Sequence, residues 1–128
     1  MTTPDSLRAF VERLVSEERY QRDQGFWAFR SGGSCAVCTD SAIKIGRHFR
    51  GTVFGYICAI NPGAAIGKQF CEGHDFAVID NRFLVDYWAF RVIRLITDPV
   101  FDLSRKPDTR EVIRLYGDPS TWEELAFD

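Results

Sequence analysis

Residues 73–88 read Gly73-His-Asp-Phe-Ala-Val-Ile-Asp-Asn-Arg-Phe-Leu-Val-Asp-Tyr-Trp88. This stretch has the pattern of two β-strands joined by a tight polar turn. Runs of β-branched and aromatic residues flank Asp80-Asn81, a pair typical of tight turns, and together they predict a β-hairpin. His74 starts the first strand and Asp86 ends the second, so antiparallel pairing brings these two ends together. The stretch therefore predicts an imidazole and a carboxylate as neighbours at one edge of a sheet.

Two amphipathic helices are predicted upstream of this hairpin, over residues 4 to about 20 and over residues 35–49. Each follows a residue that can cap it, Thr3 or Ser34, and each carries apolar residues at helical spacing on one face. Residues 52–60 have the β-branched and aromatic content of a strand, and Asn61-Pro62-Gly63 is a turn signal. The predicted helices thus come first along the chain and the strands follow.

Downstream of the hairpin the pattern is weaker. Residues 89–96 fit either a helix or a strand, and residues 97–107 have the composition of a loop. A short helix is predicted over residues 108–116, and Ser120-Thr-Trp-Glu123 is a capping-box pattern that predicts one more helical turn. We therefore expect one α+β domain over residues 1–128, with N-terminal helices in residues 1–50 packed on an antiparallel sheet formed within residues 51–128.

The composition is that of a globular domain, and it narrows the function classes. Hydrophobic residues make up 45% of the 128 residues and charged residues 27%, which argues against disorder. The 16 Lys and Arg against 18 Asp and Glu give a formal net charge of -2, whereas nucleic-acid binders usually carry a basic excess. No apolar run reaches about 18 residues, and the N-terminus lacks a secretory profile. We expect a protein made in the cytoplasm, with neither a membrane nor a nucleic acid as partner.

Cysteine, histidine and aspartate follow one another in an order that suits nucleophilic catalysis. The chain has four cysteines, at positions 35, 38, 58 and 71, and two histidines, at positions 48 and 74. A helix N-terminus favours a thiol as its thiolate, so Cys35, the first residue of the second predicted helix, is the predicted nucleophile. His74 would take its proton and Asp86 would orient the imidazole. Cys38, one turn further into the helix, is the alternative nucleophile, and no cofactor or metal is required.

Two segments of the chain resemble a known family. Ser34-Cys35-Ala-Val-Cys38-Thr-Asp40-Ser-Ala42-Ile43, followed by Gly73-His74-Asp-Phe-Ala-Val-Ile and Leu84-Val85-Asp86, resembles the papain-fold toxin domains of bacterial polymorphic toxin systems. The resemblance covers roughly residues 31–90. It implies a minimal papain-like fold with a Cys-His-Asp triad, acting as a thiol hydrolase: a peptidase, a glutamine deamidase or a related acyl transferase.

The same resemblance implies partners and a further site residue. The substrate would be a protein or peptide, a cognate immunity protein would neutralise the chain, and the chain would be delivered to another cell as a toxin effector. Papain-like enzymes use a glutamine upstream of the nucleophile to stabilise the oxyanion, and Gln24 is the candidate here by its position. A stand-alone role in the cell that makes the protein stays open.

A zinc site is the alternative interpretation of the same cysteines. Cys35-x-x-Cys38 and Cys71-x-x-His74 have the spacing of a Cys3His set, which would make the domain a zinc-stabilised structural or protein-interaction module. Glycine does not follow the first pair, as it often does in zinc knuckles, and zinc ligation by these four residues assigns no role to Asp86. We therefore favour the thiol hydrolase over the zinc module.

Overall fold

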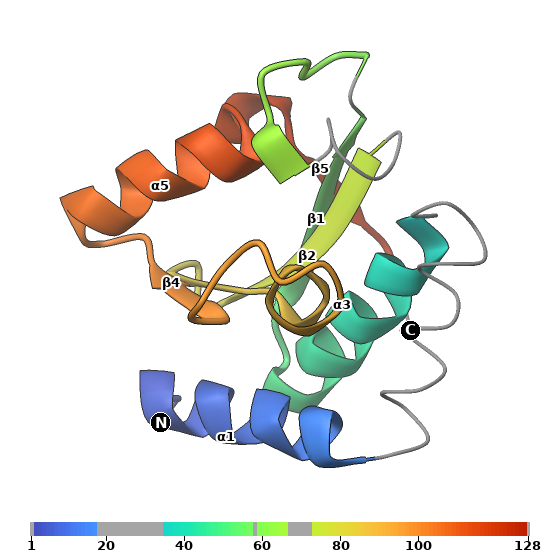
Figure 1. Ribbon diagram of the computed structural model, residues 1–128, viewed down its shortest axis with the longest axis vertical. Helices are drawn as coiled ribbons and strands as arrows, with labels where there is room; N and C mark the ends of the chain where they lie inside the picture. Colours follow the sequence, from blue (N-terminus) through green and yellow to red (C-terminus); the bar gives the residue numbers. More distant parts are fainter. Residues whose placement is uncertain (1, 18–34, 58, 67–72, 128) are drawn as a thin grey trace.

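A computed structural model of the chain describes residues 2–17, 35–57, 59–66 and 73–127, and for residues 35–37 the backbone alone. The described residues form a mixed helix and sheet structure, which confirms the α+β class (Figure 1). Its sheet has five antiparallel strands in the order β4-β3-β2-β1-β5. The strands are β1 (Thr52–Ile57), β2 (Gly73–Ile79), β3 (Phe83–Val85), β4 (Val100–Asp102) and β5 (Glu123–Leu125).

The predicted hairpin is confirmed as β2 and β3. Ala77 pairs with Val85 and Ile79 with Phe83, so the strands meet around a turn over residues 80–82. Asp80 and Asn81 have φ values of 56° and 52°, a left-handed conformation that Asp and Asn tolerate better than other side chains. Local turn chemistry therefore sets the register of these two strands.

Both N-terminal helices are confirmed. Thr3 and Ser6 form a capping box at the start of α1 (Pro4–Ser16), which ends earlier than predicted because Glu17 leaves the helical conformation. The second helix, α3, spans Cys35–Phe49 as expected. Strand β1 is shorter than expected, since the amides of Ile60 and Asn61 both donate to the carbonyl of Ile57 and turn the chain.

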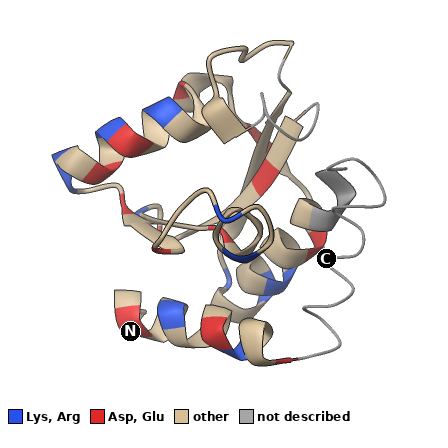
Figure 2. Ribbon diagram, viewed as in Figure 1, with Lys and Arg blue, Asp and Glu red and all other residues tan. Residues whose placement is uncertain are grey.

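Alternate residues of β2 point to opposite faces of the sheet and divide the core in two. Ala77 and Ile79 pack in one cluster with Tyr87, which precedes the π-helix η1 (Trp88–Val92), and with residues from α1, α3, β3 and β4: Leu7, Val11, Leu14, Ile45, Phe83, Val85 and Val100. Phe76 and Val78 pack in the other with residues of α5 (Lys106–Tyr116) and of η1: Val112, Leu115, Tyr116, Trp88 and Ala89. Figure 1 shows α3 and α5 on opposite sides of β1 and β2. Charged residues of both signs alternate along α1 and α5 (Figure 2).

The C-terminal third differs from the prediction in two places. The expected loop at residues 97–107 contains β4 and the start of α5. The expected helical turn from Ser120 is wrong: Asp118 caps the short 3-10 helix η2 (Pro119–Thr121), and β5 follows and pairs with β1. Residues 89–96, whose sequence fits either a helix or a strand, contain most of the π-helix η1 (Trp88–Val92). Pairing with β3 and with β1 determines β4 and β5, and local patterns do not reveal it.

Candidate functional site

His74 and Asp86 meet where the hairpin prediction placed them. His74 is the second residue of β2, and Asp86 directly follows β3. The imidazole Nε2 lies 2.6 Å from Asp86 Oδ2, and the two side chains are 0% and 2% exposed. Glycine at position 73 lets β2 approach β1 closely beside this pair, because a Cβ there would lie 2.4 Å from the carbonyl oxygen of Tyr56.

Two further donors reach the Asp86 carboxylate. The Tyr116 hydroxyl donates to Oδ2 at 2.8 Å, and the amide of Ala89, in the π-helix, donates to Oδ1 at 3.0 Å. Burial, together with the Asp86 charge, raises the pKa of Tyr116 well above its ordinary value, so its hydroxyl remains a donor at neutral pH. With His74, three donors compensate for the water that this buried carboxylate has lost.

The hydrogen bond to Asp86 determines which nitrogen of His74 is basic. A carboxylate accepts, so Nε2 carries the proton in the neutral ring and Nδ1 keeps a lone pair. Within the described parts of the chain, nothing donates a hydrogen bond to the buried Nδ1 or accepts one from it. Four aromatic rings surround the imidazole at centroid distances of 5.2 to 6.3 Å: Trp88, Tyr116, Phe76 and Tyr56. The ring is therefore held firmly with one basic nitrogen available.

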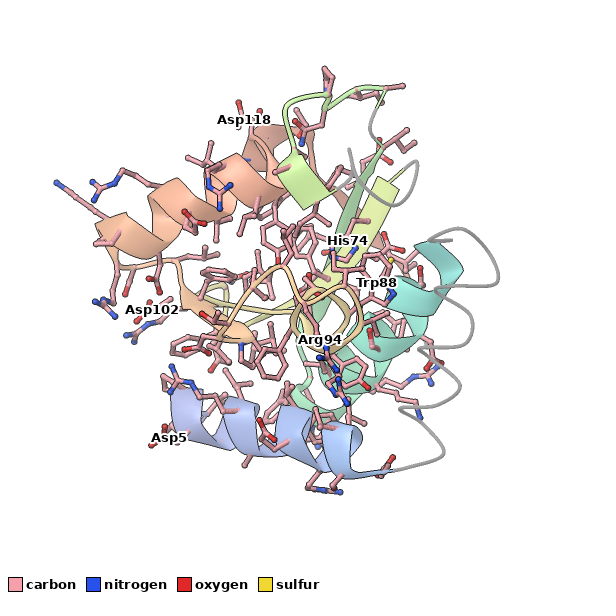
Figure 3. The ribbon with its side chains drawn as sticks, viewed as in Figure 1. Asp5, His74, Trp88, Arg94, Asp102 and Asp118 are labelled. Atoms are coloured by element: carbon pink, nitrogen blue, oxygen red, sulfur yellow. The ribbon has the colours of Figure 1, made fainter. Side chains whose placement is uncertain are left out.

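The N-terminal turns of α3 are attached to the strand that carries His74. The amide of Asp75 donates to Cys38 Sγ at 3.3 Å, and the Thr39 hydroxyl donates to Asp75 Oδ2. Cys38 is fully buried. Figure 3 shows His74 and Trp88 close to the N-terminal end of α3, whose first residue is Cys35. The fold thus brings the cysteine-bearing end of α3 to the start of β2.

Several predicted residues lie outside the described residues. These are Gln24, Cys71 and the side chain of Cys35, so the choice of nucleophile, the oxyanion donor and the zinc set remain predictions. His48 is exposed on α3, and its ring stacks on Phe10 at 4.3 Å between centroids. Among the side chains that are described, no group of three His, Cys, Asp or Glu could hold a metal ion.

Sequence reasoning missed Tyr116. It lies 30 residues from Asp86 along the chain, at the end of α5. The sequence marks it as one aromatic residue on the apolar stripe of a short helix, and no local motif links it to the hairpin. Trp88, two residues after Asp86, packs on the His74 ring with 5.2 Å between centroids.

Comparisons of the chain with protein-family models, with curated proteins and with solved structures give no match. In the described part of the chain, no helix is both long enough and apolar enough to cross a bilayer. The function of the chain is therefore inferred from the geometry around His74.

Proposed function

We propose that the chain is a thiol hydrolase or glutamine deamidase of the papain-like kind, with a cysteine of α3, His74 and Asp86 as its triad. The buried hydrogen bond between His74 Nε2 and Asp86 Oδ2, with Nδ1 left unpartnered within the described residues, carries the proposal. A general base needs a lone pair directed at the nucleophile and a second group that holds its tautomer. In His74, Nδ1 keeps its lone pair, and Asp86 holds the tautomer; that this lone pair faces a cysteine of α3 is part of the proposal.

In the proposed mechanism, Nδ1 of His74 takes the proton of the cysteine thiol. The thiolate attacks an amide carbonyl carbon, and the tetrahedral oxyanion collapses to a thioester while the imidazolium gives its proton to the leaving ammonia or amine. Water then attacks the thioester, with His74 again acting as base, and the acid and the thiol are released. Throughout, the Asp86 carboxylate stabilises the positive charge on the imidazolium.

We assign the nucleophile to Cys35 and keep Cys38 as the alternative. A thiolate gains most from the partial positive charge at a helix N-terminus, and Cys35 is the first residue of α3. Cys38 is fully buried and already accepts the Asp75 amide, as a packed core residue would. A protein or peptide substrate, a cognate immunity protein and delivery as a toxin effector are proposed from the family resemblance.

The zinc module remains the second candidate, because one observation suits it too. Zinc-bound histidines commonly donate their other ring N–H to a carboxylate, as His74 does to Asp86. Asp86 therefore fits either proposal, and the state of the cysteines distinguishes them.

The test measures metal content and thiol reactivity on the same preparation. Protein purified without added zinc is analysed for metal and then labelled with dilute iodoacetamide at pH 6. An ordinary thiol is only about 0.3% thiolate at that pH, so a catalytic thiolate reacts far faster. Mass spectrometry of peptides identifies the labelled cysteine in the wild type and in the Cys35→Ala and Cys38→Ala variants.

Histidine variants supply the matched control. His74→Ala should slow alkylation by at least about tenfold, whereas the exposed His48→Ala should leave it unchanged. Fast labelling that survives Cys35→Ala and disappears in Cys38→Ala would move the nucleophile to Cys38. One equivalent of zinc, with positions 35, 38 and 71 protected until a chelator is added, would refute the hydrolase and establish the zinc module.

A further inference from the structure

Tyr116 is joined to the candidate site at one end and to the C-terminal part of the chain at the other. Its side chain is fully buried, and its hydroxyl donates to Asp86 Oδ2. Its carbonyl oxygen accepts two hydrogen bonds, from Asn61 Nδ2 at 3.1 Å and from Trp122 Nε1 at 2.9 Å. The ring also packs edge-on against Phe76, with 4.9 Å between centroids. These contacts leave the hydroxyl little freedom to move.

The two oxygens of Asp86 are held by different elements. The π-helix holds Oδ1 through the amide of Ala89, and α5 holds Oδ2 through Tyr116, on the oxygen that faces His74. With the Ala89 amide on Oδ1 and both Tyr116 and His74 on Oδ2, the carboxylate cannot rotate about its Cβ–Cγ bond without breaking a hydrogen bond. Tyr116 therefore helps to keep Oδ2 directed at Nε2, and so keeps the lone pair of His74 on Nδ1.

We propose that Tyr116 is a positioning residue for the His74–Asp86 pair. The inference rests on the proposed thiol chemistry and extends it to a part of the chain that holds no member of the triad. It follows that the C-terminal segment from α5 to Trp122 is required to orient the base, although it contributes no group to the reacting atoms.

The test compares Tyr116→Phe with Tyr87→Phe. Both substitutions remove one buried tyrosine hydroxyl and keep the ring, and Tyr87 belongs to the core cluster on the other face of the sheet. The first readout is the proton on His74 Nε2, which a short hydrogen bond to a carboxylate shifts downfield in the NMR spectrum. With two histidines in the chain, the His48→Gln variant completes its assignment.

The second readout is the rate of iodoacetamide labelling at pH 6, and urea unfolding serves as the check on stability. A positioning role predicts that Tyr116→Phe moves or broadens the Nε2 proton signal and slows labelling by about tenfold, the lower end of the loss seen when a group that orients a metal-bound histidine is removed. Tyr87→Phe should leave both unchanged, even if it lowers stability by a similar amount. Should Tyr116→Phe not fold, Asn61→Ala, which removes one donor to the Tyr116 carbonyl, should give a smaller change in the same direction.

The outcomes separate this inference from the proposed function. If labelling of the wild type depends on His74 while Tyr116→Phe leaves the signal and the rate unchanged, Tyr116 is structural only and the inference is wrong. If labelling of the wild type is slow and independent of His74, the thiol chemistry itself fails, and the positioning role fails with it. A wild-type spectrum without the downfield proton would contradict the His74–Asp86 hydrogen bond on which both proposals depend.

Discussion

Replacing Gly117 with alanine should lower the free energy of unfolding by about 1.5–4.5 kcal/mol. Gly117 ends α5 with φ 79° and ψ -170°, a region of backbone space that is nearly exclusive to glycine. A Cβ built on it would lie 1.9 Å from Nδ2 of Asn61, well inside the contact distance of the two atoms. The same Nδ2 donates to the carbonyl of Tyr116, so a displaced Asn61 loses that bond.

Two effects make up this magnitude. Holding a residue with a Cβ in this conformation costs about 1–3 kcal/mol. Losing the buried hydrogen bond from Asn61 to Tyr116 costs about 0.5–1.5 kcal/mol more. Because Gly117 directly follows Tyr116, the variant should also disturb the hydroxyl that reaches Asp86.

Urea unfolding measures the effect, with two comparisons built in. Gly63→Ala is the matched control, since a Cβ at Gly63 meets no atom within 4 Å, and it should change the unfolding free energy by less than about 0.5 kcal/mol. In an Asn61→Ala background the contact with the Asn61 amide group and its hydrogen bond to Tyr116 are both absent, so Gly117→Ala should cost roughly 1 kcal/mol less than in the wild type. A cost below about 1 kcal/mol in the wild type, or an equal cost in both backgrounds, would refute the reasoning.

Three further changes give distinct results. Asp86→Asn should lower the thiol reactivity at pH 6, because an amide has one acceptor oxygen whereas Asp86 accepts on both; labelling as fast as in the wild type would contradict this. The guanidinium of Arg82 lowers the pKa of Asp102, so the stability from this pair is present at neutral pH and is lost as the pH falls below about 4. Asp102→Asn should accordingly reduce the loss of unfolding free energy, measured with urea, as the pH falls below about 4. An unchanged pH dependence would show that the Arg82–Asp102 pair does not contribute to this loss. Burial raises the pKa of Tyr87 to about 12, so its stabilising contribution is complete below pH 10 and is lost as the pH rises toward 12. Tyr87→Phe should reduce this loss of stability at alkaline pH. Urea unfolding between pH 9 and 12 measures it, and an equal fall in unfolding free energy with pH in the wild type and the variant would contradict the prediction.

The environment of His74 is costly for a residue with a purely structural role. A buried nitrogen without a hydrogen bond lowers stability by about 1–3 kcal/mol, and buried polar atoms in native proteins nearly always have a partner. His74 Nδ1 is such an atom within the described residues, although the ring is otherwise fully packed and its other nitrogen is strongly bonded. Proteins retain groups of this kind at functional sites, where activity is favoured over stability.

The buried carboxylate of Asp86 also argues against a purely structural role for the His74–Asp86 pair. A carboxylate at 2% exposure is expensive to bury, and three elements of the fold, β2, η1 and α5, each contribute a donor to it. An apolar side chain would fill this place in a core with fewer constraints. The convergence of these three elements on one carboxylate therefore supports a role for Asp86 beyond packing.

Short-range chain chemistry accounts for the parts of the fold that were predicted correctly. The capping box at Thr3, the apolar stripe of α3 and the turn at Asp80-Asn81 each depend on residues a few positions apart. Closure of that turn alone makes His74 and Asp86 neighbours, because their separation from the turn is similar. The histidine and aspartate of the candidate site could therefore be found without a structure.

Tertiary packing accounts for the strands and the site contact that the sequence did not predict. Strands β4 and β5 have three residues each, too few for a periodic pattern, and they exist because β3 and β1 offer them unpaired edges. The contact of Tyr116 with Asp86 joins α5 to the end of β3 across 30 residues, and only the packing of α5 against the sheet brings the hydroxyl within reach. Hydrophobic periodicity and helix capping depend on residues within one or two helical turns of each other. The hydrogen-bond donors to a buried carboxylate come from elements that only the complete fold brings together.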